Sequence, residues 1–429
     1  MLIDISIKNY LSFKDKTTFS LRATSNKDTA NMNIISLNDN INILRTSAIY
    51  WYNASWKTNF LKAIFFIRSL IVDSWRLWPN DPFLSLWWLY LQPFRLNITS
   101  QRLPAIFKIH FEIDSTLYTY EFSVTARTVH TEILSCKKTQ KEKILFKREN
   151  QKIKIYDFDD NNSISRVNEN NLALSIFAKE WSEEAKKIHK FFQEIYVFPW
   201  SWSLNDSEFM MQNEPETFKP FLKTLLTKAD LWIEDFDFSL KEIPFDQLPK
   251  PEELKNQLKL QWIPIPDHVE SHTWNTLHPI YDDNKKRVWT CVFWLQDESE
   301  WTNKILNLAW SIYDVIRNWK ILFLDELDAC LHTSLFINLI HSFNKVNTNS
   351  HYQIIFTTQD THIIDIKKYL RRDQIWFVKK DELGISSLKR LSDEDIRKEY
   401  ISEKNYYKWK FWGLNKTEES DLFDSNSIL

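Results

Sequence analysis

The chain has 429 residues, enough for two or three domains at roughly 150 residues each. Its 55 Lys and Arg against 57 Asp and Glu give a formal net charge of -2, which excludes a strongly basic nucleic-acid protein and an acidic disordered chain. Three widely separated cysteines argue against a disulfide framework or a zinc site and favour a reducing cytoplasm.

The hydrophobic segments give no sign of export or membrane insertion. The N-terminus has no basic segment followed by an apolar run, and the longest apolar stretch, 60–72, is interrupted by Lys62 and Arg68. We therefore expect a soluble cytoplasmic protein.

The first 157 residues carry strand patterns around one helix. Residues 1–24 alternate between apolar and polar types and predict two strands joined near Lys14. A short β-like run at 43–50 precedes a segment, 58–72, with helical spacing of its apolar residues. Residues 104–157 alternate again and predict antiparallel strands.

The remainder divides into an arm and a second α/β segment. Residues 165–260 are rich in charged, helix-like sequence and predict an inserted helical arm or lid, too short for a long coiled coil. From 286 the chain returns to strand and helix units. The apolar runs 321–326 and 353–358 are typical of buried parallel strands.

The glycine and tryptophan contents are anomalous. The chain has 2 Gly and 20 Trp, whereas ordinary usage of about 7% glycine would give roughly 30 glycines. Several tryptophans lie where a turn residue is expected, including Trp319 before the strand 321–326 and Trp310 after Ala309. Glycine supplies the positive φ angles that such positions require.

The segment AIYWYNASWKTNFLK, residues 48–62, explains the anomaly. With glycine at Trp51 and Trp56, it matches the phosphate-loop pattern G-x-x-x-x-G-K-[ST] at every fixed position. Successive backbone N–H groups in such a loop bind phosphate at a helix N-terminus. The predicted nucleotide-binding residues are Trp51, Tyr52, Asn53, Ala54, Ser55, Trp56, Lys57, Thr58 and Asn59.

We infer that most tryptophans here stand for glycine, because a UGA codon has been translated as Trp where the organism reads it as Gly. The alternative is a Trp-rich protein that binds sugars or forms an interface. Trp376 lies within a strand-like run and is interpreted as a true tryptophan.

The run Ile321–Leu324 followed by Asp325 and Glu326 is the Walker B pattern. Asp325 and the Thr58 hydroxyl are the predicted Mg²⁺ ligands, and Glu326 is the predicted base that activates water. A strand ending in two acids is common, so the interpretation depends on the preceding phosphate loop.

A signature motif lies one helix before Asp325. With glycine at Trp301, the run ESEWTNK reads as a Ser-x-Gly signature, so Ser299 and Trp301 are predicted to contact nucleotide. The alternative is a plain helix N-cap at Ser299. His268, His272 and His278 lie in a β-like stretch and are interpreted as ordinary strand residues, with a metal site as the alternative.

The run IIFTTQDT, 354–361, predicts a switch strand. Gln359 stands where a histidine that contacts the γ-phosphate is usual, and we predict it as a catalytic residue. Glutamine donates a hydrogen bond but cannot become cationic. His362 is an alternative for this role.

The chain resembles AAA-type ATP-binding proteins with an ABC/SMC-like core, akin to the ATPase half of OLD-family and abortive-infection systems. The resemblance is carried, in this order along the chain, by IKNYLSF, WYNASWKTN, ESEWTNKILNLA, ILFLDELDACLH and IIFTTQDT. The run YYKWKFWG, 406–413, resembles that family's C-terminal motif, with Trp409 and Trp412 again at glycine sites.

The resemblance implies an α/β P-loop NTPase fold with an ABC/SMC-like head, a mixed and parallel sheet flanked by helices, plus an inserted helical arm. We expect an N-terminal ATPase lobe at 1–164, the arm at 165–260, a C-terminal ATPase lobe at 261–414 and a flexible tail at 415–429. The N-terminal lobe carries the phosphate loop and the antiparallel strands. The C-terminal lobe carries the signature, the Walker B strand and the switch strand.

The implied activity is Mg²⁺-dependent ATP hydrolysis in an ATP-sandwich homodimer, with Ser299 of one subunit facing Lys57 of the other. Dimerisation would gate a separately encoded nuclease or effector, or a transaction with DNA or RNA, and phage defence is one setting for this. The alternatives are a non-hydrolysing ATP-gated scaffold and, if the tryptophans are real, an inactive Trp-rich binding protein.

Peptide mass spectrometry of the native protein tests the recoding. We expect glycine at positions 51, 56 and 301 and tryptophan at position 376, matching UGA and UGG codons respectively. Tryptophan at all four positions would contradict the inference.

Overall fold

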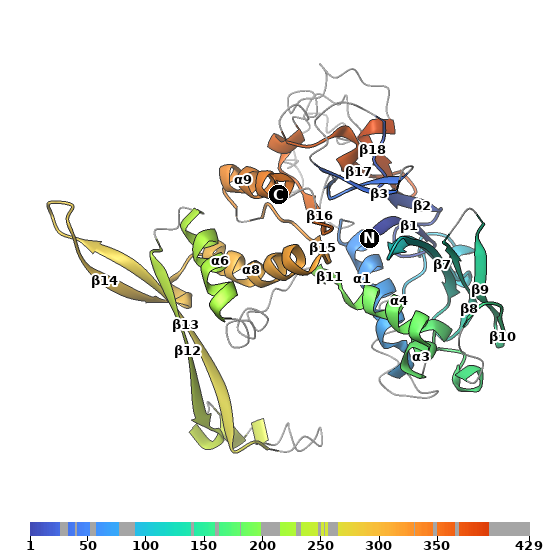
Figure 1. Cartoon of the computed structure of the whole chain (residues 1–429), viewed down its shortest axis with the longest axis horizontal. Coiled ribbons are helices and arrows are strands. Elements are labelled where there is room, and N and C mark those ends of the chain that lie inside the picture. The colour runs from blue at the N-terminus through green and yellow to red at the C-terminus, as the bar shows by residue number, and fades with distance from the viewer. Residues whose placement is uncertain are drawn as a thin grey trace, which may run out of the picture. The chain divides into compact units, whose positions relative to one another are not determined.

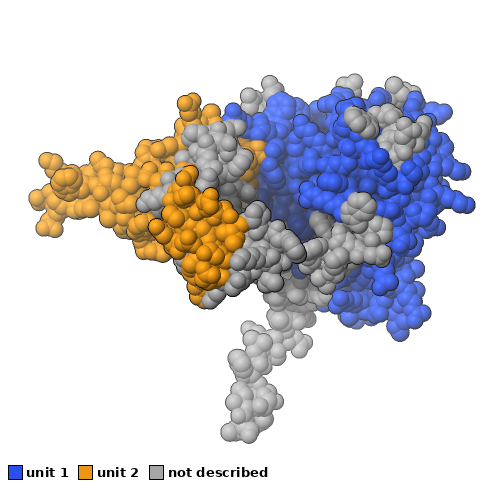
Figure 2. All heavy atoms as spheres, turned by 90° about the horizontal axis from the view of Figure 1, so that it is seen from below, with its two compact units in different colours: residues 1–201, 315–429 blue, residues 202–314 orange. Residues whose placement is uncertain are grey.

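A computed structural model gives the architecture of the chain (Figure 1). The structure describes residues 1–25, 33–38, 41–51, 57–76, 91–138, 141–158, 163–180, 182–198, 215–228, 233–247, 250–252, 254–255, 265–329, 331–345, 350–364 and 369–393. The chain forms two compact units, coloured separately in Figure 2. Unit 1 comprises Met1–Ser201 and Val315–Leu429, and unit 2 is Trp202–Asp314.

Unit 1 contains a seven-stranded antiparallel sheet with the order β10-β9-β8-β7-β6-β1-β2. Its strands are β1 (Leu2–Lys8), β2 (Thr17–Ser20), β6 (Ala105–Ile113), β7 (Thr116–Val124), β8 (Val129–Lys137), β9 (Lys143–Glu149) and β10 (Lys152–Ile155). Alternate residues of β6 and β7 are buried, which is the pattern of a sheet with one face on the core. The antiparallel strands predicted in the first 157 residues are confirmed.

A six-stranded sheet with the order β11-β15-β16-β5-β17-β18 forms the second layer of unit 1. Its strands are β5 (Thr46–Trp51), β11 (Ile195–Phe198), β15 (Ile321–Leu324), β16 (Gln353–Thr358), β17 (Ile375–Lys380) and β18 (Ser386–Arg390). All neighbours pair in parallel except β17 and β18. The fully buried runs of β15 and β16 confirm the predicted parallel strands.

Helix α1 (Lys57–Asp73) packs between these sheets. The ring of Phe60 lies 5.2 Å from Phe19 of β2 and 6.5 Å from Phe323 of β15. The ring of Phe66 lies 5.6 Å from Phe107 of β6. Because its apolar residues surround the helix axis, α1 is buried on nearly all sides.

Besides α1, the α-helices described wholly within unit 1 are α3 (Ala173–Glu180), α4 (Glu183–Gln193) and α9 (Thr333–Lys345). Helix α4 begins at an N-cap, where the Ser182 hydroxyl accepts from the Ala185 amide. The small two-stranded sheet β3 (Ile34–Asn38) and β4 (Ile41–Leu44) completes the described elements.

A buried glutamine joins the two sheets. The Gln353 side chain of β16 accepts from the Leu2 amide at 2.8 Å and donates to the Leu2 carbonyl at 2.9 Å. This pair of bonds satisfies both polar groups of one β1 residue inside the core. It fixes the first strand of one sheet against the switch strand of the other.

Unit 2 combines two helices with a sheet. Helix α6 (Pro215–Lys228) packs against the start of α8 (Glu300–Asn318) through Phe218, Leu222 and Ile305. The sheet has the order β12-β13-β14, with β12 (Asp235–Pro244), β13 (His268–Tyr281) and β14 (Arg287–Trp294).

The boundaries differ from those expected for a helical arm at 165–260. Residues 173–198 belong to unit 1, and the inserted unit continues to residue 314 because α8 packs on α6. The arm is partly β, since β12 alternates polar and apolar residues with a period of two.

None of the described helices combines the length and the hydrophobicity that crossing a bilayer requires.

The C-terminus of α8 has a Schellman motif with tryptophan at the position that favours glycine. Trp319 follows the last residue of α8 and has a φ angle of 55°, and the Lys320 amide donates to the Val315 carbonyl. The turn predicted before strand 321–326 is therefore confirmed. The turn expected at Ala309 and Trp310 is wrong, because both residues lie within α8, where Trp310 packs on Phe218.

Trp376 has the opposite character. It is 4% exposed in β17, and its ring lies 5.1 Å from that of Phe19. An indole here fills the core, as expected of a true tryptophan.

Glycine substitution should have opposite effects on stability at Trp319 and at Trp376. Trp319→Gly is expected to stabilise the chain by about 1 kcal/mol, because it removes the left-handed strain of a side chain that is 56% exposed. Trp376→Gly should destabilise it by about 3–5 kcal/mol, because it empties a buried volume. Urea unfolding measures both, and equal losses of stability would contradict the assignment of Trp319.

Candidate functional site

The predicted phosphate loop lies between a strand and a helix. Strand β5 ends at Trp51 and α1 begins at Lys57, so the strand, loop and helix context that the motif requires is present. The loop residues Tyr52, Asn53, Ala54, Ser55 and Trp56 lie outside the described residues, as does the C-terminal motif 406–413.

The first turn of α1 is held from one side. Thr58 and Asn59 are buried, and the Asn59 amide nitrogen donates to the Ser12 hydroxyl at 3.1 Å. Ser12 lies in the connection between β1 and β2, so the antiparallel sheet contacts the predicted loop end of α1. This bond orients the turn from which Thr58 projects.

The sheet order brings the other predicted residues of unit 1 to the same edge. Strand β16 pairs in parallel with β5 on one side and with β15 on the other. The carboxyl ends of the three strands therefore meet at one edge, where ligands bind in open α/β sheets. Lys57 follows β5 after the loop, Asp325 follows β15 directly, and Gln359 follows β16 directly.

One buried hydroxyl contacts both Walker B acids. Thr357 of β16 donates through Oγ1 to the Asp325 carboxylate at 2.6 Å and accepts from the Glu326 amide at 2.7 Å. Thr357 is 1% exposed and Asp325 is 4% exposed. Sequence reasoning did not single out Thr357, because a threonine at a strand end has no distinctive spacing.

Glu326 has a left-handed backbone, with φ of 46°. Such a conformation costs a non-glycine residue about 1–3 kcal/mol and persists only where the surroundings hold it. Here the Thr357 hydroxyl binds the Glu326 amide and the Ala329 amide binds its carbonyl. The conformation turns the chain sharply at the end of β15, directly after Asp325.

The segment after Glu326 binds the end of the switch strand. The Asp328 carboxylate accepts from the Gln359 and Asp360 amides at 3.0 and 3.1 Å. The alternative residue His362 bonds the Asp360 carboxylate through Nδ1 at 2.7 Å. Gln359 is exposed, so its amide side chain can reach a ligand at this edge.

The predicted signature lies in unit 2, at the start of α8. Ser299 is the N-cap, and its hydroxyl accepts from the Thr302 amide at 3.1 Å. The Ser299 hydroxyl also lies 3.0 Å from the Thr302 hydroxyl, and either oxygen can be the donor of that pair. When Thr302 donates, Ser299 keeps its own hydrogen for a phosphate oxygen, so the N-cap and the signature interpretations are compatible. Trp301 lies in the first turn of α8.

The donor types suit Mg²⁺. Thr58 offers a hydroxyl oxygen and Asp325 a carboxylate, and Mg²⁺ in nucleotide sites takes few protein oxygens beside phosphates and water. The Thr357 hydroxyl orients the Asp325 carboxylate.

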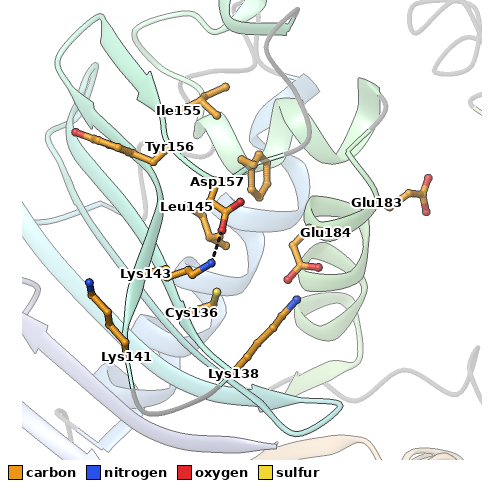
Figure 3. A pocket seen from close by; sticks show the side chains of 11 residues that line it. Cys136, Lys138, Lys141, Lys143, Leu145, Ile155, Tyr156, Asp157, Glu183 and Glu184 are labelled. Carbon is orange, nitrogen blue, oxygen red and sulfur yellow. Dashed lines mark hydrogen bonds and ion pairs between the residues drawn. The ribbon is translucent and has the colours of Figure 1, made fainter.

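A hollow of about 770 Å³ lies elsewhere in unit 1 (Figure 3). It is lined by Cys136, Lys138, Lys141, Lys143, Leu145, Ile155, Tyr156, Asp157, Phe158, Glu183 and Glu184. Lys143 bonds Asp157 at 3.2 Å, so charges of both signs line the hollow. None of the predicted site residues belongs to this lining.

Residues 52–365 match the family model described as "AAA domain, putative AbiEii toxin, Type IV TA system", which is more than half of the chain. Two solved structures resemble the fold. An SMC head bound to the C-terminal winged-helix domain of ScpA gives 12% identity, a TM-score of 0.43 and coverage of 90% of this chain and 96% of that chain. The SMC head domain from Thermotoga maritima gives 12% identity, a TM-score of 0.41 and coverage of 91% of this chain and 98% of that chain. No curated protein matches the chain.

The contribution of the Thr357 hydroxyl to the free energy of unfolding can be measured. Thr357→Val is expected to lower the free energy of unfolding by about 1–3 kcal/mol, because Asp325 and the Glu326 amide each lose the hydrogen bond with this buried hydroxyl. Thr357→Ser keeps the hydroxyl and is the control. Equal stability of the valine and serine variants in urea unfolding would contradict this role.

Proposed function

The chain belongs to the AAA-domain family whose model carries the AbiEii-type description, and from that premise we propose that it binds and hydrolyses ATP with Mg²⁺. The observation that best supports the proposal is the shared edge of β5, β16 and β15. There α1 follows β5, and the pair Asp325 and Glu326 follows β15, on the two sides of the central strand β16.

Each residue has a role that follows from its chemistry. The N-terminus of α1 attracts anionic phosphate, and Lys57 adds a positive charge toward the β- and γ-phosphates. Thr58 and Asp325 hold Mg²⁺, which when bound neutralises charge on the phosphates.

Hydrolysis requires a base beside the γ-phosphate, and Glu326 supplies it. Its left-handed backbone and the Thr357 bond to its amide fix where the side chain leaves the strand end. The carboxylate orients water and takes its proton. Gln359 provides a neutral hydrogen-bond donor in the switch position.

We further propose that ATP binding drives dimerisation. Ser299 caps α8, and its hydroxyl also lies 3.0 Å from that of Thr302. Where Thr302 donates in that pair, the Ser299 hydroxyl can donate to the γ-phosphate held by a second subunit at this helix N-terminus. Dimer opening after hydrolysis would gate a separately encoded effector or a nucleic-acid transaction, with phage defence as one setting. The presence of Glu326 favours this function over a non-hydrolysing scaffold.

Glycine restoration is the first test of the site. A chain with Trp51→Gly, Trp56→Gly and Trp301→Gly should hydrolyse ATP only with Mg²⁺, whereas the chain with tryptophans should bind no ATP, because indoles block the approach of backbone to phosphate. Phosphate release measures turnover, and Lys57→Ala in the restored chain is the control.

Glu326→Gln in the same restored chain should lower kcat by about a hundredfold or more, since the general base is lost. It should also trap an ATP-bound dimer in gel filtration. Equal turnover before and after this substitution would contradict the assignment of the base.

A further inference from the structure

Glu298, the residue before Ser299, is held by the sheet of unit 2. Its carboxylate accepts hydrogen bonds from the Thr276 hydroxyl and from Nε2 of His278, the latter at 2.7 Å. Thr276 and His278 are two residues apart on β13 and therefore share one face of the sheet. The side chain of Glu298 is only 8% exposed and that of His278 16%.

Further hydrogen bonds hold the connection between β14 and α8 in a tight turn. After β14 a short turn forms, and the Glu298 amide donates to the Leu295 carbonyl at 3.2 Å. The Asn303 side chain returns from the first turn of α8 to the same carbonyl at 3.1 Å. Glu298 therefore occupies a tight connection, and Ser299 follows it directly as the N-cap.

The imidazole of His278 is itself positioned. Its ring lies 4.6 Å from that of Phe293, which is on the neighbouring strand β14. Strand β13 pairs with β12 over His268–Leu277 and with β14 over Asn275–Tyr281. Thr276 lies where both neighbours pair with β13, so its position depends on all three strands.

We propose that Glu298 is a positioning residue. Thr276 and His278 hold its carboxylate, the carboxylate fixes the position of the adjacent Ser299, and the sheet β12-β13-β14 thereby influences the rate of ATP hydrolysis. The inference rests on the proposed function and names a means of regulating it. Because Glu298 bonds Thr276 and His278 and directly precedes Ser299, a displacement of β13 would displace the Glu298 carboxylate and the signature serine with it.

A buried carboxylate is a poor choice for stability alone, because an apolar residue of similar size avoids its desolvation. What the carboxylate adds is a defined position, since two donors on one strand hold the same oxygen, Oε1. A small displacement of a positioned group is enough to lower turnover substantially.

The test compares matched variants of the glycine-restored chain. His278→Leu removes the donor, whereas His278→Gln retains an N–H at similar reach. Arg287→Met is the control, because it breaks an exposed ion pair with Glu234 in the same sheet that does not touch Glu298. The readouts are kcat, ATP affinity, and amide hydrogen exchange over residues 298–303.

His278→Leu is expected to lower kcat roughly tenfold or more and to speed exchange at 298–303, with ATP affinity changed less than about twofold. His278→Gln should restore most of kcat, and Arg287→Met should leave it unchanged. An unchanged kcat in His278→Leu, or equal losses in all three variants, would overturn the positioning role.

Failure of the proposed function looks different. If the restored parent hydrolyses no ATP, the ATPase assignment fails and the positioning role of Glu298 fails with it, whatever the exchange data show. If the parent hydrolyses ATP and only the variants behave unexpectedly, the positioning role alone is overturned.

Discussion

The burial of α1 between the two sheets of unit 1 is the constraint on which the rest of this site depends. Phe60 contacts an aromatic residue of each sheet, so the helix cannot shift toward one without losing contact with the other. The first turn is thereby fixed at the edge where β15 and β16 end. A phosphate site needs this rigidity, because backbone N–H groups act only if they already point at the ligand. Gln353 adds to it by joining the same two layers through polar bonds.

Thr357 gives the same edge its internal order. One hydroxyl serves as donor to Asp325 and acceptor from the Glu326 amide, so the strand that separates β5 from β15 also orients the acidic pair. The Asp328 carboxylate returns across that strand end to the amides that follow it. The predicted Walker B segment and the predicted switch strand are therefore joined in one hydrogen-bonded structure.

Local patterns were enough to predict the strands, the helix after the phosphate loop and the acidic pair, because each depends on residues close in sequence. The alternation in 104–157 became β6 to β10, and the apolar run before Asp325 became β15. Contacts between distant residues had no such signal. Thr357 and His278 act through partners 20 or more residues away, and neither carries a motif. Strand β12 of unit 2 was missed because its period-two pattern in 235–244 lies within a charged, helix-rich stretch, whereas the β-like stretch that holds His278 became β13.

The turn at Trp319 has a consequence for how the gene itself is read. Among the described residues, it is the one tryptophan with a left-handed backbone, and that conformation is set by the helix end and the strand that follows rather than by the indole. Torsion angles of this kind do not depend on which genetic code was used to translate the chain. A left-handed tryptophan at a helix end therefore marks a codon whose meaning is worth checking, because glycine would occupy that backbone conformation without strain.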